Sequence, residues 1–139
     1  MSPYINNGCN YYQASDVKLA SPEGLIVLLY AEFLCCLVAS KEAFLTEDDA
    51  TRNKNMSKAV EILVELIGSL DMKKGEKIAS FLAMLYEYIA VRLFLLRREP
   101  TVERFDEVIT LITPLKEAWE IISSPNTHSK IEIAKIEIA

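Results

Sequence analysis

The hydrophobic and polar positions divide the chain into four long segments with helical patterning, joined by short polar stretches. The segment from Gly24 to Ser40 is apolar on nearly every side, and Glu32 is its only charged residue. Ser21 suits the N-cap, and Pro22 suits the first helical position, where a backbone N–H would have no partner in the helix. The pattern therefore predicts a helix over residues 22–44.

A helix that is apolar all round is normally enclosed by other parts of the protein. A membrane-spanning helix needs about 20 apolar residues. Because Glu32 interrupts this run, we predict no membrane span. We expect residues 22–44 to form a central helix that the other helices enclose, and any side that they leave uncovered would need a binding partner.

The second predicted helix follows the polar stretch 46–51, whose acidic residues suit a helix start. Ile62 and Val64 lie off its main apolar stripe and widen it. The stripe itself has the i, i+3, i+4, i+7 spacing of one buried face and comprises Met56, Ala59, Val60, Leu63, Leu66, Ile67 and Leu70.

The third predicted helix runs from Glu76 to Arg97, after a break at residues 71–75. Tyr86, Phe94 and Leu95 fall outside its buried face and need some other cover. The residues that we expect on that face are Ile78, Phe81, Leu82, Leu85, Ile89, Leu93 and Leu96.

The third helix should end before Pro100, because a residue that precedes proline disfavours the helical region. Thr101 can then cap a fourth helix, which the polar residues 123–126 terminate. Pro114 removes one backbone hydrogen bond within this helix and should kink it near Thr110. The predicted buried face comprises Val102, Phe105, Val108, Ile109, Ile112, Leu115, Trp119 and Ile122.

These segments predict an all-α fold, an antiparallel four-helix bundle over residues 21–124. Residues 1–20 are polar and rich in tyrosine, and we expect them to form an arm, with a short helix, that packs across the bundle. Residues 125–139 contain the sequence Lys-Ile-Glu-Ile-Ala twice. The isoleucines of this tail would lie on opposed faces of either a helix or a strand, so we expect the tail to be disordered.

Composition and charge narrow the classes of function. Hydrophobic residues make up 51% of the chain and the net charge is −5, with no basic cluster beyond Arg97-Arg98. Nucleic acid is therefore not an expected partner, since phosphate contacts need a concentrated basic face. The three cysteines are interpreted as buried, reduced residues, and residues 1–7 lack the pattern of a signal peptide, so we predict a cytoplasmic protein.

No pattern of catalytic or metal-ligating residues emerges. His128, the single histidine, lies in a polar segment without an ordered neighbour to orient it, and is interpreted as a surface residue. Cys35 and Cys36 lack the further ligands of a zinc site, and there is no Glu-x-x-His pair and no glycine-rich phosphate loop. We predict that the protein is not an enzyme and binds no metal or cofactor.

Apolar residues remain after the predicted core is filled, namely part of the central helix with Ile62, Tyr86, Tyr88 and Phe94. They can pack under the N-terminal arm or stand singly exposed. Alternatively they line a groove for an amphipathic helix or an extended apolar segment, because large exposed apolar patches usually mark interaction sites.

Short motifs occur throughout residues 7–122. They are Tyr12-Gln13 and Val17; Ala20-Ser21-Pro22; Leu25-Ile26 and Leu29-Tyr30; Asn53, Asn55 and Lys58-Ala59; Ile62, Leu66 and Leu70-Asp71; Lys74-Gly75 and Ile78-Ala79; Leu85-Tyr86 and Tyr88; Arg92-Leu93; Glu107-Val108; and Glu117-Ala118-Trp119. In their order and spacing these motifs resemble the flagellin-specific export chaperone family, FliS. The chain departs from the family pattern at four places: Ala31 in place of Asp, Cys9 in place of the first N-terminal Tyr, Val91-Arg92 in place of Arg-Arg, and Pro114 within a helix that is normally continuous.

The resemblance implies a cytoplasmic four-helix bundle that binds the disordered C-terminal segment of flagellin, prevents premature polymerisation and assists secretion. It also implies that Tyr12 covers the empty groove or contacts the export gate. An alternative from another class of function is a helical regulatory or adaptor protein that associates with itself. Its groove would be filled by its own arm or, in a homodimer, by the second copy.

We expect the groove to be lined by apolar side chains that do not belong to the predicted buried faces of the helices. Ile62 and Tyr86 should discriminate best between groove and core, because they lie off the main stripes of their helices. The alternative is that the predicted residues belong to the core, and Leu29, Leu66 and Leu82 fit that alternative at least as well. The full predicted set is Leu25, Ile26, Leu29, Tyr30 and Phe33 of the central helix, Ile62 and Leu66 of the second, and Leu82 and Tyr86 of the third.

Overall fold

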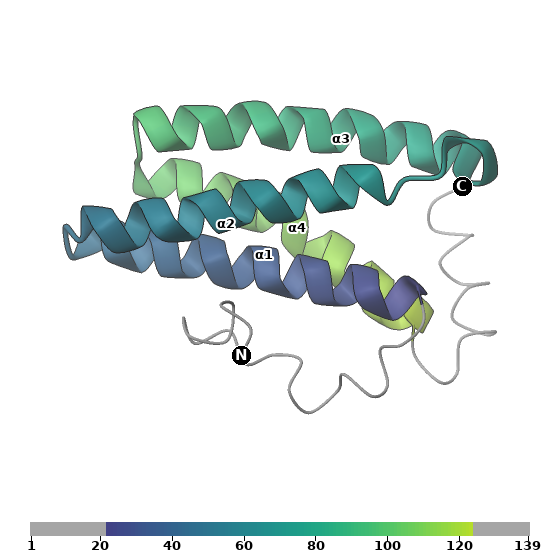
Figure 1. Cartoon of the computed structure of the whole chain (residues 1–139), viewed down its shortest axis with the longest axis horizontal. Coiled ribbons are helices and arrows are strands. Elements are labelled where there is room, and N and C mark those ends of the chain that lie inside the picture. The colour runs from purple at the N-terminus through teal and green to yellow at the C-terminus, as the bar shows by residue number, and fades with distance from the viewer. Residues whose placement is uncertain (1–21, 124–139) are drawn as a thin grey trace.

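Four antiparallel α-helices make up the part of the chain that the computed structural model describes, which is residues 22–123 without the side chains of 72–76. The helices are α1 (Pro22–Leu45), α2 (Asp49–Gly68), α3 (Met72–Arg98) and α4 (Val102–Ser123). Each helix runs opposite to the one before it in the chain (Figure 1). The predicted all-α four-helix bundle is confirmed, whereas the predicted arm, Tyr12, the Ser21 cap, His128 and the tail lie outside the described residues.

The helix ends follow the local chemistry that the sequence offers. Thr101 caps α4 as predicted, since its hydroxyl accepts a hydrogen bond from the N–H of Arg104 at 3.1 Å. Asp48 caps α2 by accepting the N–H of Thr51 at 3.1 Å. Hydrogen bonding from the Thr51 side chain, and then from its N–H, lowers the pKa of the Asp48 carboxyl. α4 continues helical through Pro114, and the kink near Thr110 stays a prediction.

The predicted break at residues 71–75 is wrong, because α3 begins at Met72 and includes Gly75. The chain turns instead at residues 69–71, just after α2 ends. A glycine inside a helix costs only about 1 kcal/mol relative to alanine. That penalty is too small to end a helix whose later turns pack against the rest of the bundle.

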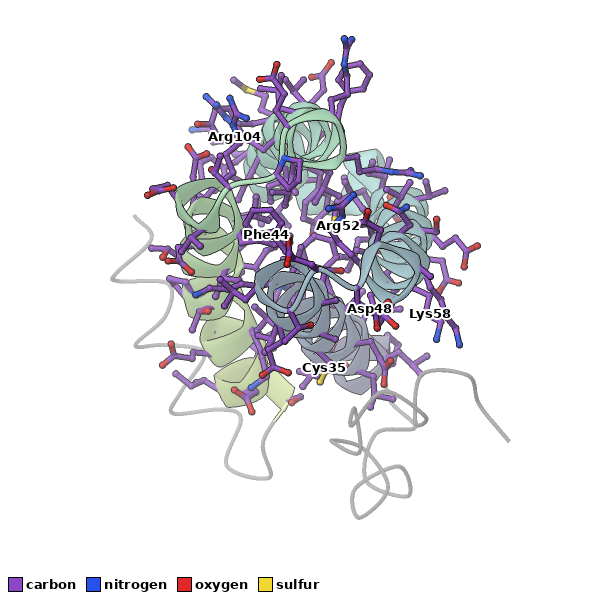
Figure 2. All side chains as sticks on the ribbon, turned by 90° about the vertical axis from the view of Figure 1, so that its left-hand side faces the viewer. Cys35, Phe44, Asp48, Arg52, Lys58 and Arg104 are labelled. Atoms are coloured by element: carbon purple, nitrogen blue, oxygen red, sulfur yellow. The ribbon has the colours of Figure 1, made fainter. Side chains whose placement is uncertain are left out.

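The core lies along the axis of the bundle and takes side chains from all four helices. Figure 2 looks along this axis from the end with the α1–α2 and α3–α4 turns, and Phe44 points between the helices there. The rings of Phe44 and Phe105 are 5.9 Å apart and tilted by 37°. The largest fully buried side chains are Tyr30, Tyr86, Phe33, Phe105, Leu37, Met56, Ile62, Leu66, Ile89, Leu93, Leu96 and Ile112.

The predicted buried face of α3 is partly wrong, because Ile78 and Phe81 are exposed and Tyr86 is buried. The observed core positions, Ala79, Leu82, Tyr86, Ile89, Leu93 and Leu96, alternate spacings of three and four residues. α3 carries a second apolar face at helical spacing, with Phe81, Met84 and Val91 exposed on it. Periodicity alone could not decide which face points inward.

The same correction applies to α2. Ile62, which was predicted to lie off the stripe, is 1% exposed, whereas Ile67, a predicted stripe residue, is exposed. Met56, Ala59, Leu63 and Leu66 are buried as expected.

α1 is not enclosed by the other described helices, contrary to the prediction. It packs directly against α2 and α4, and the four helices occupy the corners of the bundle, so each keeps an outer side (Figure 2). Leu25, Val38 and Leu45 are exposed on α1. Within the described residues, this helix therefore has apolar surface that the bundle does not cover.

Two segments, Pro22–Leu45 and Lys77–Arg98, have mean hydropathies of 1.9 and 1.7 and are long enough to cross a membrane. The core helix of a soluble protein meets the same criteria, and both segments contribute to the core of this bundle. Length and composition are weak evidence by themselves, so the absence of a membrane span stays a prediction.

Candidate binding groove

A cavity of about 1180 Å³ opens at the end of the bundle where α1 and α3 begin and α2 and α4 end. Its volume exceeds the range of roughly 300–1,000 Å³ that small-molecule pockets usually have. We call it the groove. Its apolar lining comprises Pro22, Leu25, Ile26, Leu28 and Leu29 of α1, Leu70 of the α2–α3 turn, Ile78, Ala79, Leu82 and Tyr86 of α3, and Trp119 of α4.

The α1 wall of the groove follows from helical spacing. Leu25, Leu29 and Glu32 stand at i, i+4 and i+7 and therefore share one face of the helix. Leu25 is 53% exposed, whereas the Glu32 side chain, which also lines the groove, is only 4% exposed. This wall thus combines accessible leucine surface with a buried carboxylate.

The opposite wall comes from the first turns of α3. Ile78 and Leu82 are four residues apart and line the groove together. Ile78 is exposed and Leu82 is buried, so the wall passes from the surface of the bundle into its core. A ligand could therefore insert apolar side chains between α1 and α3.

A pair of buried tyrosines joins the two walls at the base of the groove. The hydroxyls of Tyr30 on α1 and Tyr86 on α3 are hydrogen-bonded to each other, and Trp119 of α4 also hydrogen-bonds to Tyr30. Burial raises the pKa of Tyr30, while the hydrogen bonds from Tyr86 and Trp119 act in the opposite direction. Burial also raises the pKa of Tyr86 well above its ordinary value, and the adjacent Tyr30 raises it further. Both phenols are therefore neutral at physiological pH.

Five of the nine predicted groove residues line this cavity: Leu25, Ile26, Leu29, Leu82 and Tyr86.

The other four, Tyr30, Phe33, Ile62 and Leu66, are fully buried members of the core. The premise that Ile62 and Tyr86 lie off the core faces is wrong, since these side chains are only 1% and 2% exposed. Ile62 therefore no longer discriminates groove from core, because a charged residue there would disrupt packing. Whether any of the nine contacts a partner stays a prediction.

Sequence reasoning missed most of the other lining residues, among them Glu32, Ile78 and Trp119. A signal for Glu32 was present, because it is the single charge in the apolar run 24–40. Ile78 and Trp119 carried no separate signal, since both fit the stripe of a buried face. Among the described residues, no cluster of three His, Cys, Asp or Glu side chains could hold a metal ion.

Comparison with known proteins places the chain among flagellar proteins. A family model described as "Flagellar protein FliS" matches residues 5–126. The chain is 32% identical over 122 residues to the flagellar secretion chaperone FliS of Campylobacter jejuni, which covers 88% of this chain and 95% of that protein.

Two further relatives carry the same name. The Salmonella typhimurium protein is 33% identical over 110 residues, covering 78% of this chain and 82% of the relative. The Vibrio cholerae protein is 26% identical over 124 residues, covering 89% of this chain and 90% of the relative. Together with the four-helix bundle, these matches show that the chain belongs to the FliS family of flagellar proteins.

Proposed function

We propose that this protein is a cytoplasmic flagellar export chaperone that binds the disordered C-terminal segment of flagellin, prevents its premature polymerisation and assists its secretion. The relatives are named flagellar secretion chaperones. The observation that carries the proposal is the groove between α1 and α3, which is lined mainly by apolar side chains. Such grooves bind amphipathic helices through anchors at helical spacing.

The physical chemistry of the groove suits a chaperone rather than a catalyst. Binding an amphipathic segment removes its apolar face from water, and a covered face cannot pack against other subunits. When a disordered segment folds as it binds, part of the interaction free energy is spent on ordering it. The complex can therefore be specific and still release its cargo at the export gate, which Tyr12 is proposed to contact.

Isothermal titration calorimetry of the full chain against a synthetic peptide of the flagellin C-terminal segment tests the proposal. We expect saturable binding and a negative heat-capacity change, because apolar surface is buried. Leu25→Asp should weaken binding by about tenfold or more, since it places a charge on the exposed wall of the groove.

Val64→Asp provides the matched control. Val64 is also an exposed aliphatic residue, at 61%, but it lies on α2 and does not line the groove. This variant should bind like the parent. No binding by the parent, or equal loss in both variants, would contradict the proposal. A dimer on size exclusion that Leu25→Asp dissociates would support the self-associating adaptor instead.

A further inference from the structure

Within the part of the chain whose side chains the structure describes, the four charged residues that line the groove are acidic. They are Glu23 and Glu32 of α1, Glu65 of α2 and Asp71 of the α2–α3 turn, and none of the described lysines or arginines lines it. The whole chain has a net charge of −5, with 15 basic and 20 acidic side chains. The described lining of the groove is therefore more one-sided in sign than the chain as a whole.

Glu32 places a carboxyl group inside the apolar part of the groove. Its side chain is 4% exposed and stands on the same face of α1 as Leu25 and Leu29. A ligand that covers these two leucines also meets the carboxylate. Charges interact more strongly there than at the surface, because little water screens them.

Glu65 lines the groove from α2 and is exposed. An approaching ligand therefore meets carboxylates both at the surface and deeper in the groove. An acidic ligand would be repelled at both depths. A ligand with basic side chains beside its apolar ones would be attracted at both.

We propose that the groove selects an amphipathic helix that carries Lys or Arg on the edge of its apolar face, with Glu32 and Glu65 as the carboxylates that recognise it. The occupant is a segment of the exported partner, so this inference rests on the proposed function and adds a charge requirement to it. On a helix, a basic residue three or four positions from an apolar anchor lies beside that anchor. Electrostatic complementarity of this kind governs specificity and the association rate.

The test compares two peptides of the Campylobacter jejuni flagellin C-terminal segment, one native and one with every Lys and Arg replaced by Gln. Each is titrated into the full chain and into Glu32→Gln, Glu65→Gln and the double variant, at low and physiological salt. We expect the parent protein to bind the native peptide about tenfold more tightly than the Gln-substituted peptide. Physiological salt should reduce this difference in affinity. The difference should be lost in the double variant.

Glu61→Gln is the matched control, because Glu61 is exposed on α2 but does not line the groove. It should keep the parental preference, and helical content and melting should confirm that every variant is folded. Glu65→Gln keeps the test valid if Glu32→Gln is unstable.

Equal affinity of the two peptides for the parent, or a preference that persists in the double variant, would overturn the inference. A second outcome would also overturn the inference: both peptides bind, and with equal affinity, only after residues 1–20 are deleted. The groove would then be assigned to the chain's own arm. If neither peptide binds, the proposed function fails. The charge requirement is then decided with designed Leu/Lys and Leu/Gln amphipathic peptides, of which only the first should bind.

Discussion

The two ends of the bundle differ in how they are held together. At the end with the α1–α2 and α3–α4 turns, Phe44 packs on Phe105, and Nζ of Lys41 lies 2.7 Å from Oδ1 of Asp106. Both following helices also have side-chain caps there. At the other end, the described residues leave an open cavity of about 1180 Å³.

This difference separates stability from binding along the bundle. The end with the turns buries Phe105 and caps the starts of α2 and α4, so it can hold the four helices in register. The groove end can therefore leave Leu25 and Ile78 exposed for a partner. We call the first the closed end and the second the groove end.

The largest expected effect is on core packing at the closed end. Phe105 is fully buried, so Phe105→Ala should lower the free energy of unfolding by about 3–5 kcal/mol. Leu25→Ala at the groove end should change it by less than about 0.5 kcal/mol, because Leu25 is exposed. Urea unfolding of the two variants measures the contrast, and similar losses would refute the division between the ends.

The tyrosine pair beneath the groove gives an intermediate effect that depends on pH. Tyr86→Phe removes the hydrogen bond to Tyr30 and should cost about 1 kcal/mol near neutral pH. The folded-state pKa of Tyr86 is raised above the ordinary value of 10.0. The stabilisation that the neutral Tyr86 phenol contributes is therefore fully present below pH 10 and is lost as the pH rises above it.

Urea midpoints of the parent and Tyr86→Phe, compared at neutral and alkaline pH, isolate this contribution. The parent should lose stability more steeply above pH 10 than the variant, which has no phenol at this position. Parallel losses would mean that Tyr86 ionises as readily in the folded protein as in the unfolded one.

The smallest expected effect concerns a cap at the closed end. Thr101→Ala removes the acceptor of the Arg104 N–H and should cost about 1 kcal/mol or less, with Thr101→Ser restoring most of it. Peptide affinity should not change, because Thr101 lies at the end opposite the groove. Thermal unfolding measures the first effect and calorimetry the second. A weaker affinity would show that the closed end influences the groove.

The sequence predicted the number, order and direction of the helices because these depend on local chemistry. Prolines, caps and polar turns fall where helices start and stop, as Pro22 and Thr101 illustrate. Family membership was likewise readable from motifs spread over the chain, and the match over residues 5–126 confirms it.

The sequence could not decide which apolar face of α2 and α3 points inward. α3 carries apolar residues on opposite sides, so Phe81 and Tyr86 were equally compatible with the core. Helical periodicity describes one helix at a time, whereas burial depends on how α3 is rotated against α2 and α4. Tyr86 lines the groove, but the premise that placed it there, a position off the core face of α3, is wrong.

What the sequence determined by itself was therefore the set of helices and the excess of apolar side chains that implies a partner. Only the tertiary structure decided that Ile62 and Phe33 fill the core while Leu25, Ile78, Trp119 and Glu32 line one groove. These four come from three helices and are up to 94 positions apart in the chain, from Leu25 to Trp119. Side chains so distant in sequence share a site only because packing of the helices brings them together.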